Sequence, residues 1–335
     1  MRALLSRTTG GPETLELATI PVPTPGPGQV RIRIEAAGLN FPDTLMIEDK
    51  YQVIQERPYV PGGEFSGVID AVGEGVTGLD VGARVVTLAE RGGFAEFALA
   101  DASRVFPVPD SVSSEVAASL LVTFGTTHLA LRTQAGLKPG ERLLVLGASG
   151  GVGTAAVSLG KAIGAHVIAG VSTEEKIQVA RKAGADEVFV YPRGPFDEEG
   201  RRDLARLMKA AAGKGGADVV YDPLGGDYAD PLVRALAWGG RYLVVGFVAG
   251  IPQLKTNLLL LKAASASGVF WGQWTARNPD QFRAQAKELL AMCAAGTLAP
   301  QISQTLPLDR AAEGFVALSQ RSATGKIIVV PGTAA

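Results

Sequence analysis

The arrangement of apolar and polar positions divides the chain into two kinds of region. In the first third, short runs of alternating or β-branched apolar residues are separated by glycine and proline, a pattern typical of strands joined by turns. Such runs predict strands at 30–35, 67–72, 83–89 and 94–99. We therefore expect residues up to about 115 to form a compact, barrel-like all-β domain.

The period of the pattern changes beyond that region. Apolar residues recur three and four positions apart over 113–134, which predicts one helix. Strand-like runs and helical periods then alternate, as in a parallel sheet covered by helices on both faces, so we expect a doubly wound α/β domain. The predicted strands are 143–146, 166–171, 187–190, 217–222 and 241–247, and the predicted helices are 152–163, 174–183, 201–212 and 228–237. The tail adds a core-facing helical turn at 257–262, helices at 280–295 and 308–320, and a strand at 326–330.

The composition of the 335 residues narrows the class of protein. A hydrophobic fraction of 47% with 19% charged residues is typical of a folded globular protein, and the length suits two domains. The net charge of −1 and a pI near 6.2 argue against nucleic acid or an anionic membrane as the main partner. Apolar runs are too short to span a membrane or to serve as a signal peptide, so we expect a cytoplasmic protein.

Cysteine and histidine are too scarce to form a metal site of the common kinds. Cys293 is the only cysteine, which excludes an internal disulfide, and its apolar helical surroundings predict a small buried side chain. His128 and His166 are the only histidines, and their separation excludes a paired-histidine motif on one helix. We therefore expect no bound metal.

A glycine-rich loop follows the first strand of the alternating region and leads directly into a predicted helix. Ala148, Gly150 and Gly153 match the dinucleotide-binding fingerprint, with alanine in place of its first glycine. Gly150 lets the backbone approach a pyrophosphate, and Gly153 lets the helix pack closely on the strand, so that the helix N-terminus faces the anion. The predicted cofactor contacts in this loop are Ser149, Gly150, Gly151, Val152 and Gly153.

The end of the second strand of this region distinguishes NADPH from NADH. An NAD enzyme usually carries Asp or Glu there, to bond the ribose 2′-hydroxyl. This chain has Ser172 instead, followed by Lys176, and a hydroxyl with a cation suits a 2′-phosphate. Ser172 also begins a Ser-Thr-Glu-Glu sequence that fits a helix capping box, so a role as a helix cap stays open. The residues favour NADPH.

Six short motifs occur in a characteristic order along the chain. They are Asn-Phe-Pro-Asp at 40–43, Pro-Gly-Gly-Glu-Phe-Ser-Gly at 61–67, Gly-Gly-Phe-Ala-Glu-Phe at 92–97, Ala-Ser-Gly-Gly-Val-Gly at 148–153, Lys-Ala-Gly-Ala-Asp at 182–186 and Val-Val-Tyr-Asp at 219–222. This set resembles the zinc-free quinone oxidoreductases of the medium-chain dehydrogenase/reductase superfamily. The resemblance covers nearly the whole chain, and the ordered set is far more specific than any one motif.

The resemblance implies a fold and an assembly. A GroES-like β-barrel-type domain, residues 1–122 and 272–335, would be interrupted by a Rossmann doubly wound domain, residues 123–271. The resemblance further implies a homodimer in which the Rossmann sheet of one subunit continues into that of the other. The candidate edge of the sheet is 265–271.

The resemblance also implies roles for single residues. Asn40 and Asp43 match family residues near the nicotinamide and its ribose, and Thr127 matches a helix residue that faces the cofactor. The remaining matches are Ser172, Lys176 and Tyr191 for the 2′-phosphate, and Phe247 for a position beside the nicotinamide.

The chain departs from the similar zinc alcohol dehydrogenases at their metal site. Those enzymes use Cys where this chain has Asn40 and Gly-His-Glu where it has Gly62-Gly63-Glu64, and they carry a four-cysteine zinc loop. Without zinc, no Lewis acid polarises an alcohol, whereas an electron-poor acceptor needs less help. We expect NADPH-dependent hydride transfer to a quinone or an α,β-unsaturated carbonyl compound.

The oxyanion that forms on the acceptor needs a hydrogen-bond donor and then a proton. The candidate donors are Tyr51, Tyr59, Asn40 and a ribose hydroxyl of the cofactor. Tyr51 also fits a tyrosine without function, and Asp43 also fits a turn or a helix cap. The predicted catalytic set is Asn40, Asp43, Tyr51 and Thr127.

Two other functions stay open on the sequence. A reductase of small activated alkene acids, such as acrylates, haloacrylates or enoyl thioesters, would need a cation, and Arg57, Lys50 and Arg277 are available. A non-catalytic NADPH-binding protein would reuse the same fold. Trp271 and Trp274 fit either an apolar wall for a flat substrate or packing in the core or in a dimer interface.

Overall fold

The computed structural model describes residues 1–332, which form two compact units. One comprises Met1–Val122 with the chain from Asp280 onward, and the other comprises Thr123–Pro279. The second boundary falls between 279 and 280 rather than between 271 and 272, because helix α9 (Trp271–Arg277) stays with the second unit. Trp271 packs so closely on Gly125 that a Cβ added there would lie 2.5 Å from the ring carbon Cζ2. Positions 333–335 of the predicted first domain lie outside the described residues.

The first unit is built on a seven-stranded sheet. Its order is β14-β15-β3-β4-β5-β7, and β6 joins it by pairing with β3, while β1 and β2 form a separate antiparallel pair. The strands are β1 (Arg2–Ser6), β2 (Leu15–Thr19), β3 (Gln29–Leu39), β4 (Glu64–Val72), β5 (Arg84–Leu88), β6 (Phe97–Asp101), β7 (Val105–Pro107), β14 (Ile302–Pro307) and β15 (Lys326–Val330).

The end of β3 gathers residues that are far apart in the sequence. Gly38 lies opposite Glu64, the first residue of β4, and residues 37–39 pair on the other side with the residues that follow Lys326 in β15. Asn40, directly after β3, is therefore placed between the first residues of two neighbouring strands.

The first unit also contains helices, and one of them, α1 (Phe41–Ile47), lies within the region predicted to be all-β. The helices are α1, α2 (Ser114–Ala117), α10 (Pro279–Ala294) and α11 (Ala311–Ser319), with 3-10 turns η1 (Pro12–Thr14), η2 (Ala102–Arg104) and η6 (Leu308–Arg310). Of these, α1 was missed because it has only 7 residues, too few to show a period. Its start is fixed locally instead, by the extended backbone at Asn40 and by the Asp43 carboxylate, which accepts the Asn40 N–H at 2.8 Å.

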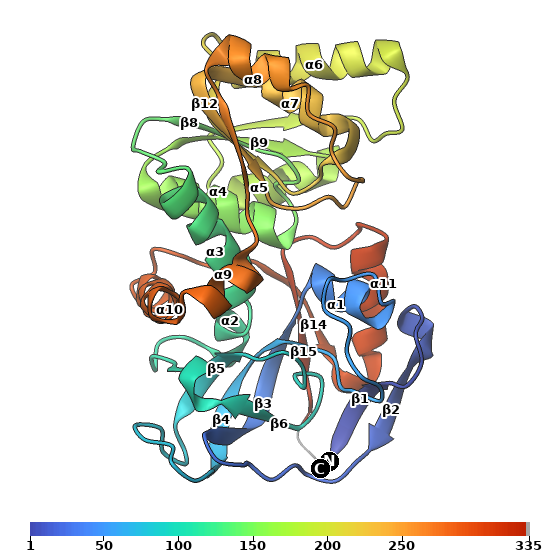
Figure 1. The fold of residues 1–335 in the computed structure, drawn as a ribbon, viewed down its shortest axis with the longest axis vertical. Coiled ribbons are helices and arrows are strands. Elements are labelled where there is room, and N and C mark those ends of the chain that lie inside the picture. Colours follow the sequence, from blue (N-terminus) through green and yellow to red (C-terminus); the bar gives the residue numbers. More distant parts are fainter. Residues whose placement is uncertain (333–335) are drawn as a thin grey trace. The chain divides into compact units, whose positions relative to one another are not determined.

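The second unit is a six-stranded parallel sheet with the order β10-β9-β8-β11-β12-β13. Its strands are β8 (Arg142–Val145), β9 (His166–Val171), β10 (Glu187–Val190), β11 (Ala217–Asp222), β12 (Leu236–Val244) and β13 (Ser265–Gly268). Helices α4 (Gly151–Ile163) and α5 (Ile177–Lys182) cover one face, and α6 (Glu198–Ala212), α7 (Ala229–Ala235) and α8 (Thr256–Lys262) cover the other (Figure 1). The predicted α/β class with a doubly wound sheet is confirmed. The order in which strands are added to the sheet reverses between the parallel neighbours β8 and β11, which makes their carboxyl ends the expected ligand side.

The single helix predicted over 113–134 is broken into three pieces. α2 ends at Ala117, α3 (Leu121–His128) begins four residues later, and a π-helical stretch, Leu129–Gln134, follows. The break has an electrostatic cause that sequence periodicity does not contain. The Glu64 carboxylate accepts the Val122 N–H at 2.9 Å, which caps a new helix start at this point.

Two predicted elements after β11 also shift. The helix predicted to reach 237 ends at Ala235, because β12 begins at Leu236 and a register irregularity lets its first part pair with Ala217. The four leucines at 258–261 were expected to face the core. Leu260 and Leu261 are instead 79% and 65% exposed, since four consecutive positions of a helix cannot all lie on one face.

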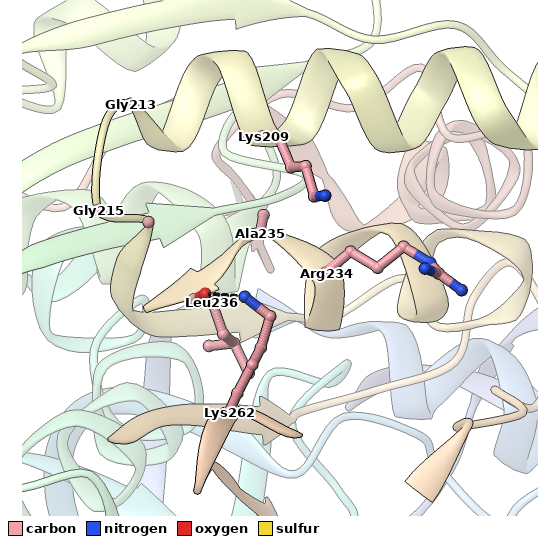
Figure 2. Close-up of a pocket in the computed structure, with 8 residues that line it drawn as sticks. Lys209, Gly213, Gly215, Arg234, Ala235, Leu236 and Lys262 are labelled. Carbon is pink, nitrogen blue, oxygen red and sulfur yellow. Dashed lines mark hydrogen bonds between the residues drawn. The ribbon is translucent and has the colours of Figure 1, made fainter. Parts of the chain in front are cut away.

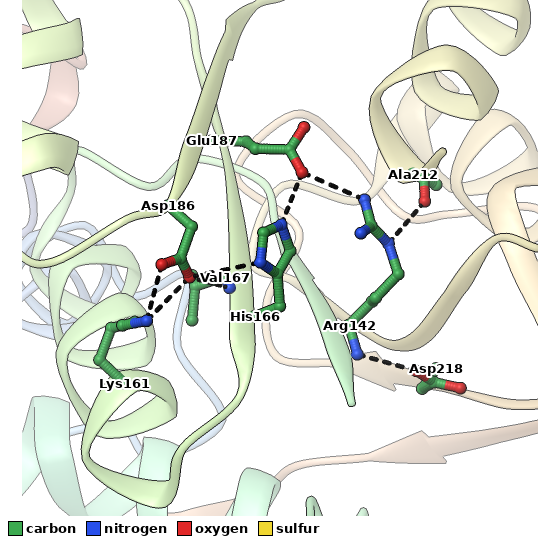
Figure 3. A network of polar contacts seen from close by, with 8 residues as sticks. All are labelled: Arg142, Lys161, His166, Val167, Asp186, Glu187, Ala212 and Asp218. Atoms are coloured by element: carbon green, nitrogen blue, oxygen red, sulfur yellow. Dashed lines mark hydrogen bonds and ion pairs between the residues drawn. The ribbon is translucent and has the colours of Figure 1, made fainter. Parts of the chain in front are cut away.

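Ion pairs close the amino end of the second sheet. Figure 3 shows His166, at the start of β9, hydrogen-bonded to the Glu187 carboxylate at 2.5 Å, which Arg142 also contacts at 3.3 Å. Beside it, Asp186 pairs with Lys161 at 2.7 Å and accepts the Val167 N–H. These contacts assign His166 and the Asp186 motif to the scaffold.

A pocket of about 210 Å³ lies at the same amino end (Figure 2). Lys209 and Lys262 reach into it from opposite sides, and Arg234 lines it too. Each of the three cations sits in the last turn of its helix, where it offsets the partial negative charge of the helix end, and Lys262 donates to the Leu236 carbonyl. The helix ends therefore account for these cations without a ligand.

In residues 1–332, every helix falls short of the length and apolar character that crossing a membrane requires.

Candidate active site

The loop between β8 and α4 has the backbone of a phosphate-binding turn. Gly147 has a φ of 62°, and the Gly150 N–H bonds the Gly147 carbonyl at 3.0 Å. A Cβ on Gly153 would lie 2.1 Å from the Gly147 oxygen, so only glycine fits there. The helix packs on the strand end as closely as the fingerprint requires.

The N-terminus of α4 presents unpaired amides. The first intrahelical bond is donated by Thr154 to the Gly150 carbonyl at 2.8 Å, so the N–H groups of Gly151, Val152 and Gly153 precede the ladder. The first turn carries no acidic side chain, and Ser149 beside it is buried. Amides and helix dipole together make this end of a 13-residue helix attractive to an anion.

The end of β9 gathers cations around Ser172. The Arg193 guanidinium donates to the Ser172 hydroxyl at 3.3 Å, and burial together with the Arg193 charge lowers the pKa of Lys176. Ser172 does not cap the following 3-10 helix (Glu174–Lys176), whose cap position is Thr173. The Glu175 carboxylate bonds Thr173, which lowers its pKa. The alternative interpretation, in which Ser172 is the N-cap of the helix that follows β9, is therefore wrong.

Arg193 was missed from the sequence because it follows β10, outside the fingerprint. The loop that carries Arg193 is held by Tyr228. The Tyr228 hydroxyl donates to the Pro192 carbonyl and accepts the Gly194 N–H. Tyr191 is buried and packs edge-on against the Tyr228 ring, with centroids 5.4 Å apart. The buried tyrosine supports the loop, and the exposed arginine presents the charge.

Asp222 organises the loop after β11. Its carboxylate accepts the N–H groups of Leu224 and Gly225 at 2.8 and 3.0 Å and the Tyr242 hydroxyl, while burial raises its pKa. Phe247, in the next loop of the same sheet edge, is 51% exposed and its backbone borders Gly225. An apolar ring this exposed is available to pack on a ligand.

The first unit buries four polar side chains in one cluster, Asn40, Asp43, Glu64 and Lys326. The Lys326 ammonium donates to the Asn40 amide oxygen at 2.5 Å and to the Glu64 carboxylate at 2.7 Å. The Asn40 amide nitrogen donates to Glu64 at 3.0 Å and to the Gly38 carbonyl at 3.2 Å. Because both of its N–H groups are used, Asn40 is not a free donor for a substrate oxyanion, and that part of its predicted role is corrected.

The Asp43 carboxyl is the unusual titrating group of this cluster. Burial raises its pKa to about 7, although the N–H groups of Asn40 and Gly62 and the charge of Lys326 act in the opposite direction. A carboxyl with this pKa holds a proton in part of the molecules at neutral pH, which suits general acid chemistry. The Asp43 carboxyl caps the start of α1, and burial brings its pKa close to neutrality.

The two candidate tyrosines differ in their surroundings. Tyr51 is half-buried, and burial and the Asp43 charge raise the pKa of its phenol, so it stays protonated and able to donate. Tyr59 is 3% exposed with Arg57 stacked 5.7 Å from its ring centroid. Tyr51 is the more accessible donor.

Thr127 is fully buried inside the second unit. Its hydroxyl donates to the Thr123 carbonyl at 2.8 Å and meets the Tyr221 hydroxyl at 3.1 Å. Thr127 therefore supports the packing of α3 on β11. Because it is fully buried, it cannot contact a substrate directly, and its predicted catalytic role is corrected to a structural one.

Other predicted side chains fall into the scaffold. Trp271 is buried against Gly125, which decides its role in favour of packing. Cys293 is half-buried, and burial raises the pKa of its thiol to about 12. Residues 1–332 show no group of three or more His, Cys, Asp or Glu side chains arranged to hold a metal ion.

Replacing Asp43 by Asn tests its titration. An acid whose pKa is raised in the folded state stabilises most below its unfolded pKa and loses that contribution as pH rises through the folded value. Wild type should therefore lose stability relative to Asp43→Asn between about pH 4 and pH 7, with a slope approaching about 1.4 kcal/mol per pH unit. Urea unfolding at pH 5, 6, 7 and 8 measures this difference, and parallel curves for the two proteins would contradict the shifted pKa.

Comparison with known proteins agrees with this architecture. The model of the alcohol dehydrogenase GroES-like domain matches residues 26–110, and the model of the zinc-binding dehydrogenase domain matches residues 151–292. The chain is similar to the quinone oxidoreductase-like protein 2 of Bos taurus, with 36% identity over 88% of this chain and 83% of that protein. It is also similar to the quinone oxidoreductase of Homo sapiens, with 33% identity over 98% of both chains.

Solved structures give the same result. A mycobacterial protein solved with NADPH is 33% identical, with a TM-score of 0.89 over 99% of this chain and 100% of that chain. The Escherichia coli quinone oxidoreductase, also solved with NADPH, is 26% identical with a TM-score of 0.89 over the same shares. With its sequence motifs, its two domains and these relatives, the chain belongs to the zinc-free quinone oxidoreductase family of the medium-chain dehydrogenases/reductases.

Proposed function

We propose that this protein transfers a hydride from NADPH to a quinone or an α,β-unsaturated carbonyl compound without the help of zinc. The observation that carries the proposal is the group of cations at the end of β9, where Arg193 bonds Ser172 and no carboxylate stands at the first position after the strand. A buried carboxyl of the first unit, Asp43, whose pKa burial raises to about 7, supports it. The first feature selects the cofactor, and the second supplies a proton.

NADPH fits the residues at the carboxyl end of the second sheet. The amides of Gly151, Val152 and Gly153 at the start of α4, with Ser149 and Gly150 in the loop before them, suit the pyrophosphate. Ser172, Lys176 and Arg193 suit a 2′-phosphate, with Tyr191 beneath them, and an NADH ribose would find no carboxylate in that position. Phe247 provides an apolar ring for the nicotinamide. Two similar proteins were solved with NADPH, which supports the assignment.

The chain's own contribution to the chemistry is orientation and proton supply. Bound NADPH supplies the hydride, which carries two electrons to the acceptor. Tyr51 donates a hydrogen bond to the oxygen on which negative charge develops, and then its proton. Asp43 replaces the proton lost by Tyr51 and is itself reprotonated from solvent. Asn40 holds the start of α1, and Thr127 holds α3.

The residue types at the cluster favour this route over zinc catalysis. Zinc-dependent alcohol dehydrogenases have zinc-binding Cys and His at the positions of Asn40 and Gly63. Neither Asn40 nor Gly63 offers a comparable zinc ligand. Lys326 instead brings a fixed positive charge into the cluster.

Reduction of alkene acids is the second candidate, and ion pairing weighs against it. Arg57 is held by Asp49 at 2.9 Å and Lys50 by Glu48 at 2.6 Å, so two of the three cations considered for a carboxylate substrate are already neutralised. Arg277 is exposed. A non-catalytic role would leave the buried Asp43 carboxyl with no task beyond capping the start of α1.

Two further expectations remain proposals. We place the protein in the cytoplasm, and we propose a homodimer that extends the second sheet. The edge strand β13 and the exposed leucines Leu260 and Leu261 near it support such an interface.

Replacing Arg193 by Ala tests the cofactor assignment. A charge-assisted hydrogen bond to the 2′-phosphate is lost, so KM for NADPH should rise about 10-fold or more, and KM for NADH should not change. Arg181→Ala, which removes an exposed arginine of α5, is the matched control. An equal effect on both cofactors, or none, would count against a 2′-phosphate contact.

Replacing Tyr51 by Phe tests the proton donor. We expect kcat to fall about 100-fold with little change in KM for NADPH, because general acid catalysis is lost while the cofactor site is intact. Stopped-flow or steady-state absorbance of NADPH measures the rate. If Tyr59→Phe carries the loss instead, the donor is Tyr59.

A panel of acceptors tests the reaction itself. NADPH oxidation should be fastest with 1,2-naphthoquinone or with an enone such as methyl vinyl ketone, and slower with NADH. Turnover confined to acrylate or 2-chloroacrylate would transfer the proposal to the alkene-acid reductases. Tight NADPH binding with no turnover of any acceptor would leave only the binding-protein alternative.

A further inference from the structure

The Asn40–Asp43–Glu64–Lys326 cluster contains two charged side chains whose roles the sequence did not indicate. Lys326 and Glu64 are 4% and 0% exposed, and their ion pair joins positions 262 residues apart. A buried ion pair is rarely a net source of stability, because removing both charges from water outweighs much of their attraction. Its presence in the first unit therefore calls for another physical reason.

The space around the pair is shaped for it. A Cβ on Gly38 would lie 2.7 Å from the Lys326 Cε and 3.0 Å from a Glu64 carboxylate oxygen, so the lysine passes where only glycine leaves room. One Glu64 oxygen accepts from Lys326 and Asn40, and the other accepts the Val122 N–H. Both side chains thus occupy fixed positions with directed contacts.

Asn40 connects the ion pair to Asp43 through hydrogen bonds. Lys326 and Glu64 hold the amide of Asn40 from both ends, oxygen and nitrogen. The backbone N–H of the same Asn40 donates to the Asp43 carboxylate at 2.8 Å. The ion pair reaches the titrating carboxyl through one intermediate residue.

The charges that face Asp43 come from four segments. Lys326 of β15 favours its ionised form and Glu64 of β4 opposes it, and the phenols of Tyr51 and Tyr59 interact with it as well. At the other end of α1, Asp49 is paired with Arg57. On α11, which packs against α1, Glu313 is exposed and paired with Arg310.

We propose that Lys326 and Glu64 are positioning residues for the reaction: they lock Asn40 at the start of α1 and so hold the Asp43 carboxyl where it can keep and release a proton. The proposal rests on the proposed function, in which Asp43 supplies that proton through Tyr51. The two charges act on Asp43 in opposite directions, which separates this role from a merely structural one.

The pH profiles of two variants test the proposal. Because Asp43 acts as an acid, kcat of the wild type should fall as pH rises through about 7. In Lys326→Met the falling limb should move up by about one pH unit, and in Glu64→Gln it should move down by a similar amount. Both variants should also show a lower plateau, by about 10-fold, because Asn40 loses a fixed contact. The assay uses NADPH with 1,2-naphthoquinone.

The matched control is Lys161→Met, which breaks the pair between Lys161 of α4 and Asp186 in the second unit and should leave the pH profile unchanged. Lys326→Gln replaces Lys326→Met if the latter does not fold, since it removes the charge but keeps a donor. A lower plateau with an unmoved limb, or limbs that move in the same direction, would overturn the positioning role.

A second readout does not depend on turnover. The difference in unfolding free energy between a protein with Asp43 and its Asp43→Asn variant changes with pH, and the pH at the midpoint of that change is the measured quantity. This midpoint pH should be higher in the Lys326→Met background and lower in the Glu64→Gln background. If no acceptor is reduced by the wild type, the proposed function fails but this measurement still decides the coupling. Unchanged midpoints in both backgrounds would overturn the coupling itself.

Discussion

The first unit depends on the burial of one carboxylate, that of Glu64. A carboxylate away from water is tolerated only when its oxygens are occupied by donors and its charge is compensated. Here the donors come from the start of β15, from the end of β3 and from the start of α3, so those segments must all be in place at once. The compensating ammonium belongs to the last strand, so this carboxylate is compensated only once the chain has returned to the unit.

The second unit obeys a different constraint, the close approach of backbone to backbone at the carboxyl end of its sheet. Gly153 lies against the Gly147 carbonyl and Gly225 against the loop of Phe247, so the turns that border a ligand are shaped by missing side chains. Polar contacts fix the loops around this end of the sheet: Asp222 holds the loop after β11, and Arg193, after β10, bonds Ser172 after β9. Ion pairs and helix-end cations line the amino end of the same sheet, and the carboxyl end is the side that suits a nucleotide.

Sequence periodicity and motif spacing predict most of the second unit, because its strands and helices are long enough to show a period and its fingerprint has a fixed spacing. β9, β10 and β11 fall at the predicted residues. Features set by distant contacts were not predictable in the same way. The break before α3 comes from Glu64, and the burial of Thr127 depends on Tyr221. Lys326 opens an apolar strand, and nothing near it in the sequence reveals that Asn40 and Glu64 surround its ammonium.

Cys293 has a practical consequence for work on this protein. Alkylation by maleimides and iodoacetamides requires the thiolate, and a half-buried thiol with a pKa near 12 offers almost none at neutral pH. We therefore expect Cys293 to react slowly with thiol-directed labels at neutral pH. A cysteine introduced at a fully solvated position should react much faster, which favours attaching a fluorophore or spin label at one chosen point with the natural residue in place.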